Sequence, residues 1–131
     1  MNALPSANDP VTEVLTAFRD RVLGVSESVI STGDGLLVVA DTDSSHPESV
    51  AALAAAHLSL GRRMAEQTGT GPLREVVSRG ATGHVVILAI GERALLTVIG
   101  DEGLDVEALR HEAPLLVERL GTLLEANSAA G

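Results

Sequence analysis

The side chains that could do chemistry in this chain do not form a recognisable catalytic set. Its histidines lack the HxxxH and HExxH spacings with which two imidazoles bind one zinc ion. No serine lies in a GxSxG nucleophile elbow. A hydrolase that uses Asp34, Asp41 or a histidine is the least favoured function, because an acid, a base and a nucleophile cannot be assembled. The histidines are His46, His57, His84 and His111.

A glycine-rich stretch, STGDGLLVVA at residues 31–40, raises the question of phosphate binding. Phosphate loops place such glycines between a strand and a helix, where the helix amides meet the anion. Here strand-like residues lie on both sides, and neither GxGxxG nor GKS or GKT occurs. Asp34 and Gly35 both tolerate the positive φ of a tight hairpin. The stretch is therefore predicted to be a β-turn. GTGP at 69–72 is predicted to be a break between a helix and a strand.

Arg62 and Arg63 end a predicted helix, where a cation complements the helix dipole and nearby carboxylates. An arginine finger that stabilises a transferring phosphate in a GTPase is a second interpretation, which the sequence allows but does not favour. His57 lies near the alanine face of the same helix. It could lie at a contact between two copies of this helix or be an ordinary half-buried residue, and the second is favoured. Glu107 and His111 share a helix face at a spacing that usually places such a pair in solvent.

The composition disfavours several classes of function. The net charge is −9, and all nine basic residues are arginine. Nucleic-acid binding needs a basic field, and single-strand binding also uses aromatic platforms, whereas Phe18 is the only aromatic residue. The chain has no cysteine, which excludes disulfides, thiol catalysis and Cys-ligated zinc. No apolar run is long enough for a membrane span, and residues 1–10 lack a signal-peptide pattern. We expect a cytoplasmic protein with no membrane insertion and no cofactor.

The length of 131 residues fits one domain, predicted over residues 10–126 between flexible ends at 1–9 and 127–131. Asp9 and Pro10 are typical of a helix start, and Gly24 ends the helical apolar period that follows. The predicted order is helix, two strands, helix, three strands, helix. The strands are 25–31, 36–42, 73–79, 84–90 and 94–100, and the later helices are 47–67 and one that begins near 105.

The last three strands are joined by links so short that they force antiparallel hairpins. Strands 84–90 and 94–100 are almost wholly apolar, so helices should cover both of their faces. These features predict an α/β (α+β) domain with a five-stranded antiparallel sheet between helical layers. In the last helix Pro114 removes a backbone donor, and we expect a kink or a restart there.

Several motifs follow one another along the chain. They are a strand followed by S-x-x-D-G-L at 31–36, an alanine-rich helix ending near G-x-x-M-A, and G-x-L-x-x-V at 71–76. A double hairpin whose last strand reads A-x-L-T-V completes them. In their order and spacing these motifs resemble the small bacterial members of the roadblock/dynein-light-chain domain family. The resemblance covers about residues 10–125. Pro114 departs from the family's uninterrupted last helix.

The resemblance implies a profilin-like sheet in the order 2-1-5-4-3, with the middle helix on one face and the two terminal helices on the other. It also implies a homodimer joined through the third strand and the middle helix. Members of the family typically regulate or scaffold small Ras-like GTPases without catalytic machinery of their own. Some bacterial members act beside a sensor kinase. The first expected function is therefore a non-enzymatic GTPase regulator or scaffold in bacterial signalling.

The middle helix indicates which surfaces would serve these roles. Its large apolar row, made of Val50, Leu53, Leu60 and Met64, can face the sheet. Its small-residue face would let a second helix approach, although alanine can also simply fill a solvent-facing helix. Strand 73–79 would be an apolar sheet edge, a template for association. The predicted dimer interface is Ala51, Ala55, Leu58, Leu73, Val76, Val77 and Arg79, and the predicted partner-binding surface is Ser59, Arg62, Arg63 and Glu66.

A small-molecule sensor is the second expected function, because sheets flanked by helices often bind ligands between their layers. It would need an aliphatic pocket under the middle helix. The sequence marks no polar groups that converge on such a pocket.

Overall fold

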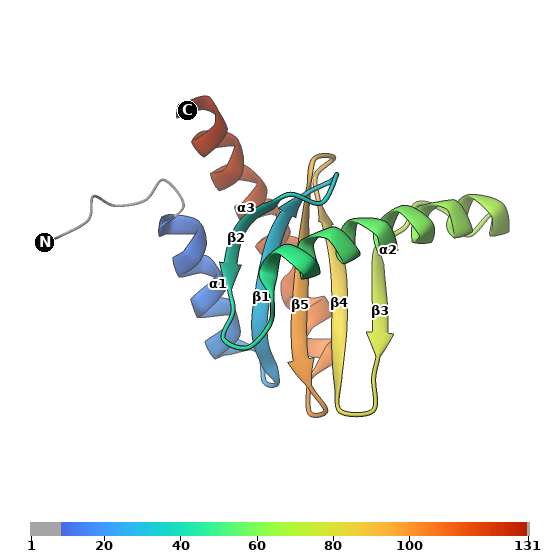
Figure 1. The fold of residues 1–131 in the computed structure, drawn as a ribbon, viewed down its shortest axis with the longest axis horizontal. Coiled ribbons are helices and arrows are strands. Elements are labelled where there is room, and N and C mark those ends of the chain that lie inside the picture. Colours follow the sequence, from blue (N-terminus) through green and yellow to red (C-terminus); the bar gives the residue numbers. More distant parts are fainter. Residues whose placement is uncertain (1–8, 131) are drawn as a thin grey trace, which may run out of the picture.

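A computed structural model describes residues 9–130, which form three helices and five strands in the predicted order (Figure 1). The helices are α1 (Asp9–Arg21), α2 (Pro47–Thr68) and α3 (Val106–Ala130). The strands are β1 (Val25–Thr32), β2 (Leu37–Asp41), β3 (Glu75–Arg79), β4 (Gly83–Ile90) and β5 (Ala94–Asp101).

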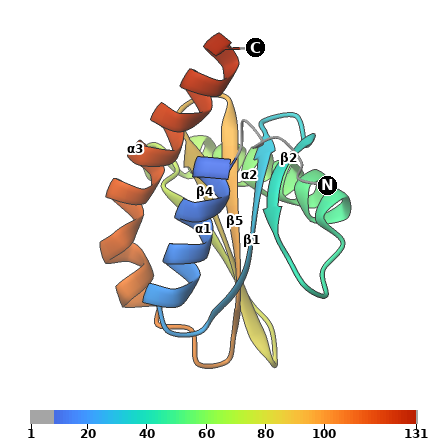
Figure 2. The ribbon, with the colours of Figure 1, turned by 90° about the vertical axis from the view of Figure 1, so that its left-hand side faces the viewer.

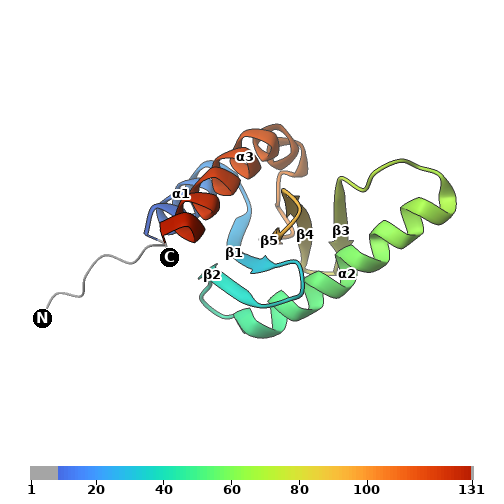
Figure 3. The same cartoon turned by 90° about the horizontal axis from the view of Figure 1, so that it is seen from above.

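The five strands form one antiparallel sheet in the order β2-β1-β5-β4-β3, which confirms the predicted topology. The apolar strands β4 and β5 lie inside the sheet, as their composition indicates. α1 and α3 cover one face (Figure 2), and α2 lies alone across the other (Figure 3). The order leaves β2 and β3 as the two edges of the sheet.

The larger core lies between the sheet and the helices α1 and α3. It is aliphatic apart from Phe18, which is fully buried. Because alternate residues of a strand point to opposite faces, β4 and β5 contribute to both sides of the sheet. The side chains that α1 and α3 bury most completely in this core are Val11, Leu15, Phe18, Leu109 and Leu120.

A smaller core lies under α2. Its buried members are Ala54 and Leu58 from the helix and Ile87 and Leu95 from the sheet. The small volume of alanine lets the helix lie close to the strands. α2 is therefore held by fewer and smaller side chains than the helices on the opposite face.

The glycine-rich stretch after β1 is a hairpin turn, as predicted. The N–H of Thr32 donates to the carbonyl of Leu36 at 2.8 Å, and the N–H of Gly35 donates to the carbonyl of Thr32 at 3.0 Å. Gly35 has a φ of +93°, a value that favours glycine. The stretch connects β1 to β2, so it does not present a helix N-terminus to a phosphate.

α3 differs from the expectation in two places. It continues through Pro114, so the expected restart is wrong. Pro114 and Arg110 are both exposed, and water can bond to the Arg110 carbonyl that the proline leaves without a helical donor. The helix also runs to Ala130, so the segment predicted as a tail is helical up to that residue. The predicted flexible N-terminus, apart from Asp9, lies outside the described residues.

Candidate functional site

The outer face of α2 carries three large apolar side chains that nothing else in residues 9–130 buries. Leu53, Leu60 and Met64 are 61%, 64% and 65% exposed. Their spacing places them in one row along the helix, which we call the outer stripe. Single exposed apolar residues are ordinary, but a row on one helix is typical of a contact surface.

The small-residue face of α2 packs on the sheet, so the sequence-based assignment of the two faces is wrong. Ala51 is fully buried and Leu58 is 3% exposed, while Ala55 packs against the same small core. These three residues fill the core of their own chain and are withdrawn from the predicted dimer interface. The larger row of an amphipathic helix is normally the buried one. Here close packing on alanine leaves the longer side chains outside.

β3 presents an outer backbone edge that pairs with no other described strand. On this strand Val77 is 40% exposed and Arg79 is exposed. Leu73 and Val76 are half-buried and pack against the core under α2. An unpaired edge that carries apolar residues is a template on which another strand can add.

α2 crosses the start of the edge strand at Gly61. A Cβ atom there would lie 2.9 Å from Cδ2 of Leu73 and 3.1 Å from Cγ2 of Val76, closer than side chains normally pack. The glycine therefore permits a tight crossing. Because Leu60 and Met64 flank Gly61 in the helix, the crossing brings this part of the outer stripe close to β3.

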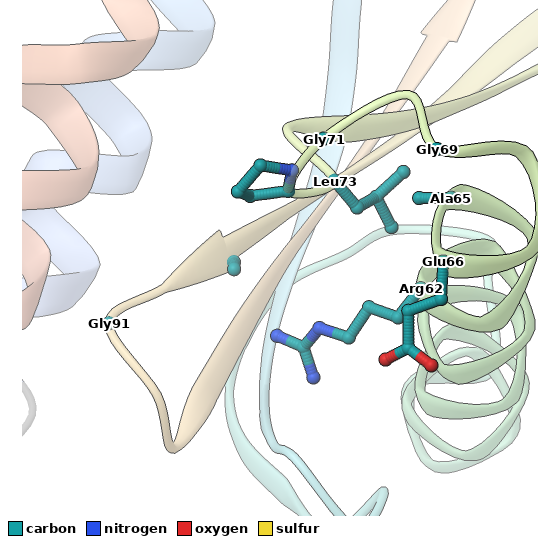
Figure 4. Close-up of a pocket in the computed structure, with 9 residues that line it drawn as sticks. Arg62, Ala65, Glu66, Gly69, Gly71, Leu73 and Gly91 are labelled. Carbon is teal, nitrogen blue, oxygen red and sulfur yellow. The ribbon is translucent and has the colours of Figure 1, made fainter.

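An open groove of about 740 Å³ lies where the end of α2, the loop to β3 and the β4–β5 turn meet (Figure 4). Leu73 contributes to its apolar wall, and Arg62 and Glu66 project into it from α2. Within the described part of the chain, no ion pair engages the Arg62 guanidinium, whereas Arg19, Arg21 and Arg110 all have carboxylate partners.

The four residues predicted to bind a partner are all exposed on α2, as that role requires. Arg62 and Glu66 border the groove, and Ser59 and Arg63 lie on the helix outside it. In a chain with a net charge of −9, the adjacent Arg62 and Arg63 form a local basic site. The role of these residues in partner binding stays a prediction.

Glu27 on β1 is a buried carboxylate that the sequence analysis did not single out. Its Oε2 accepts N–H bonds from Asp43 at 2.5 Å, Ser44 at 3.0 Å and Ser45 at 3.2 Å. Its Oε1 accepts the hydroxyl of Ser45 at 2.5 Å. Burial raises the pKa of this carboxyl, but the bonds from Ser45, Asp43 and Ser44 outweigh burial and lower the pKa to about 2. The group is therefore ionised at neutral pH and holds residues 43–45.

The remaining candidate residues have ordinary contacts. His57 is exposed rather than half-buried, and its Nδ1 lies 2.9 Å from the Leu53 carbonyl oxygen. Glu107 pairs with Arg110 at 3.5 Å. No three metal-ligating side chains group together among residues 9–130. None of the helices in that range has an apolar stretch that could cross a bilayer.

A five-stranded antiparallel sheet in the order 2-1-5-4-3, with one helix on one face and two on the other, is the roadblock fold. The chain belongs to the Roadblock/LC7 domain family, whose family model matches residues 11–100. The resemblance inferred from the motifs is thus confirmed. No curated protein matches the chain in sequence.

Several solved structures share this fold. The Roadblock/LC7 domain from Streptomyces avermitilis is 25% identical, with a TM-score of 0.79 over 86% of this chain and 96% of that one. Myxococcus xanthus MglB is 16% identical, with a TM-score of 0.80 over 97% and 96% of the two chains. An MglB with a tetrameric arrangement is 18% identical, with a TM-score of 0.83 over 95% of each chain. At these identities the MglB structures establish likeness of fold.

Proposed function

We propose that this domain is a non-enzymatic homodimeric regulator or scaffold of a small Ras-like GTPase in bacterial signalling. Membership of the Roadblock/LC7 family supports the class of function. The observation that carries the proposal is the outer stripe of α2 beside the unpaired edge of β3. A chain that exposes these two features together has a surface suited to association.

The dimer would join two copies through the same surface on each. Antiparallel pairing of β3 with the partner's β3 would extend the sheet and satisfy the free edge. The two α2 helices would then lie side by side, and each outer stripe would be covered by the other. Leu53, Leu60 and Met64 thus replace the three residues withdrawn above, while Val77 and Arg79 remain at the proposed strand contact. The half-buried Leu73 and Val76 stay predictions for the border of that contact.

The GTPase would bind the exposed polar surface at the end of α2. The guanidinium of Arg62, which has no carboxylate partner in the described chain, is available to an acidic group of a second protein. In this proposal the arginines recognise the partner by contact and perform no catalysis. A sensor-kinase system is a further class of partner that the family resemblance implies.

The test first captures a GTPase from lysate and then measures its binding to this chain with both proteins purified. The immobilised chain is exposed to native lysate with a non-hydrolysable GTP analogue or with GDP, and the retained GTPase is purified. Its affinity is then measured for the wild type, the double variant Arg62→Glu/Arg63→Glu, and the control Arg119→Glu. Arg119 is an exposed arginine on α3, so the control makes the same kind of charge change on another face.

We expect one nucleotide state to be preferred, and charge reversal on α2 to weaken binding by about tenfold or more. The control should bind like the wild type. Failure of the folded chain to bind a GTPase in either nucleotide state would overturn the proposed function. Equal weakening by the Arg119 substitution would instead place the contact elsewhere.

The groove at the end of α2 favours one alternative, a domain that senses a small molecule. Arg62 and Glu66 converge on it from the helix, and Leu73 supplies apolar contact. The groove lies at the end of α2 rather than under its middle, where the sequence analysis placed such a pocket. A metabolite library screened by thermal shift tests this function, with Arg62→Ala expected to abolish any shift that a ligand in the groove produces.

A further inference from the structure

The start of α2 has no side-chain cap of its own. His46 occupies the N-cap position with φ −91° and ψ 99°, and its side chain makes no capping hydrogen bond. Pro47 follows at the first helical position, where a missing N–H is tolerated. The loop that leads into this start is the one that Glu27 binds, through the backbone N–H groups of residues 43–45.

In the middle of α2, Leu58 is the one long side chain that packs into the core under the helix. The other buried residues, Ala51 and Ala54, have no long side chain to interlock with the strands. Farther along, the close crossing at Gly61 fixes the helix against Leu73 and Val76. Nearer its start, α2 also passes close to Gly35 of the β1–β2 turn, where a Cβ would lie 3.2 Å from Cα of Ala52. The direction of the helix across the sheet thus depends on these two close contacts and on the loop that Glu27 holds.

We propose that Glu27 is a positioning residue for the surface of α2. Its carboxylate, fixed in β1, holds residues 43–45 and so determines where the helix begins on the sheet. This aligns the outer stripe with the edge of β3. The effect of Glu27 on the position of α2 occurs within a single chain. Its effect on association rests on the proposed dimer.

The decisive variant is Glu27→Gln, which keeps the size of the side chain. Its amide replaces one acceptor oxygen with a donor, in a place where four donors converge on the carboxylate. The matched control is Glu112→Gln. That change removes a carboxylate that pairs with Arg21 between α1 and α3, away from α2. Ser45→Ala is a milder variant that removes only one of the four donors and keeps a test available if Glu27→Gln does not fold.

The position of α2 is measured directly with spin labels. The chain has no cysteine, so Ala56→Cys on α2 and Arg119→Cys on α3 are labelled specifically, and both positions are exposed. Doubly labelled chain is mixed with excess unlabelled chain so that only distances within one chain contribute. We expect the Glu27→Gln background to shift or broaden the distance distribution, and the Glu112→Gln background to leave it unchanged.

Two further measurements accompany the distances. Hydrogen exchange in the peptide covering residues 43–50 should rise about tenfold in Glu27→Gln, with the β5 peptide unchanged. Sedimentation equilibrium should show a dimer about tenfold weaker for this variant and unchanged for Glu112→Gln. Ser45→Ala should change all three quantities in the same direction by a smaller factor.

An unchanged distance distribution in both Glu27→Gln and Ser45→Ala would overturn the inference, as would equal changes in Glu112→Gln. A displaced helix with a dimer as tight as the wild type would show that Glu27 orders the loop without aligning the interface. A monomeric wild type would reject the proposed dimer. The distance measurement would then still decide whether Glu27 positions α2, so the two failures are distinguishable.

Discussion

Gly61 of α2 lies directly against the side chain of Leu73, and a Cβ on this glycine would come within 2.9 Å of Leu73 Cδ2. Glycine inside a helix costs about 1 kcal/mol relative to alanine. The close crossing accounts for its presence in the interior of α2. The same contact joins the helix that carries the outer stripe to the residues that lead into the sheet edge.

Replacing this glycine tests the crossing. Gly61→Ala should gain helix propensity, but the new methyl must displace Leu73 and Val76. Because overpacking costs about 1–3 kcal/mol, we expect a net loss of about 1 kcal/mol, measured by urea unfolding. Gly121→Ala in α3 is the control. Its methyl would meet Ile90 Cγ2 at 3.6 Å, an ordinary contact, so it should stabilise the chain. Stabilisation by both changes would contradict a tight crossing.

The outer stripe is tested with a charge. Leu60→Glu places a carboxylate in the middle of the proposed α2–α2 contact, where burial without a partner is costly. We expect a monomer by light scattering at concentrations where the wild type is a dimer. Leu60 is 64% exposed in the single chain, so the monomer should stay folded by circular dichroism. Leu115→Glu makes the same change at a residue on α3 that is 75% exposed, and it should leave the dimer intact.

The Glu27 carboxylate makes stability depend on pH. Its pKa is about 2 in the folded chain against an ordinary value of 4.5. Because the pKa is lower in the folded chain, the ionised carboxylate makes its full contribution to stability above about pH 4.5. This contribution is lost as the pH falls toward 2. A shift of this size corresponds to about 3 kcal/mol of unfolding free energy. We expect the difference in unfolding free energy between wild type and Glu27→Gln, measured with urea, to decrease steadily from pH 5 to pH 3. A difference that stays constant over this range would mean that the carboxylate titrates normally.

Thr97 offers a test of the sheet interior. It is 1% exposed, and its hydroxyl has no hydrogen-bond partner among the described residues. Thr97→Val removes this hydroxyl at nearly constant volume. We expect the free energy of unfolding, measured by thermal unfolding, to rise by about 1 kcal/mol. Thr32→Val is the opposite case. Its Oγ1 accepts the N–H of Leu36 at 3.0 Å and donates to Asp34, so its loss should destabilise the hairpin.

The elements of the fold could be predicted because their patterns are local. Strands β4 and β5 are apolar runs separated by a short turn, and Asp34 with Gly35 marks the first hairpin. The faces of α2 could not be assigned in this way. Periodicity separates an alanine face from a leucine face, but it does not say which one meets the sheet. That depends on how closely the helix can approach the strands.

The role of Glu27 lay beyond sequence reasoning for a different reason. Its partners in residues 43–45 lie across a hairpin and a loop, and no spacing rule links them to β1. One signal was available. In VSESVIST the acid lies in a strand most of whose residues are buried, and an inward carboxylate needs donors. Finding those donors required the fold.

The buried residues and the outer-face residues of α2 are different sets, and this affects how sequences with this fold can diverge. The residues that hold the helix to its sheet, Ala51, Ala54 and Leu58, are separate from those on its outer face. Substitutions at Leu53, Ser59 or Arg63 should therefore leave the buried contacts intact while they change the surface that we propose for association. If that proposal holds, copies of such a gene can acquire different partners, or stop pairing with one another, with no change to the scaffold.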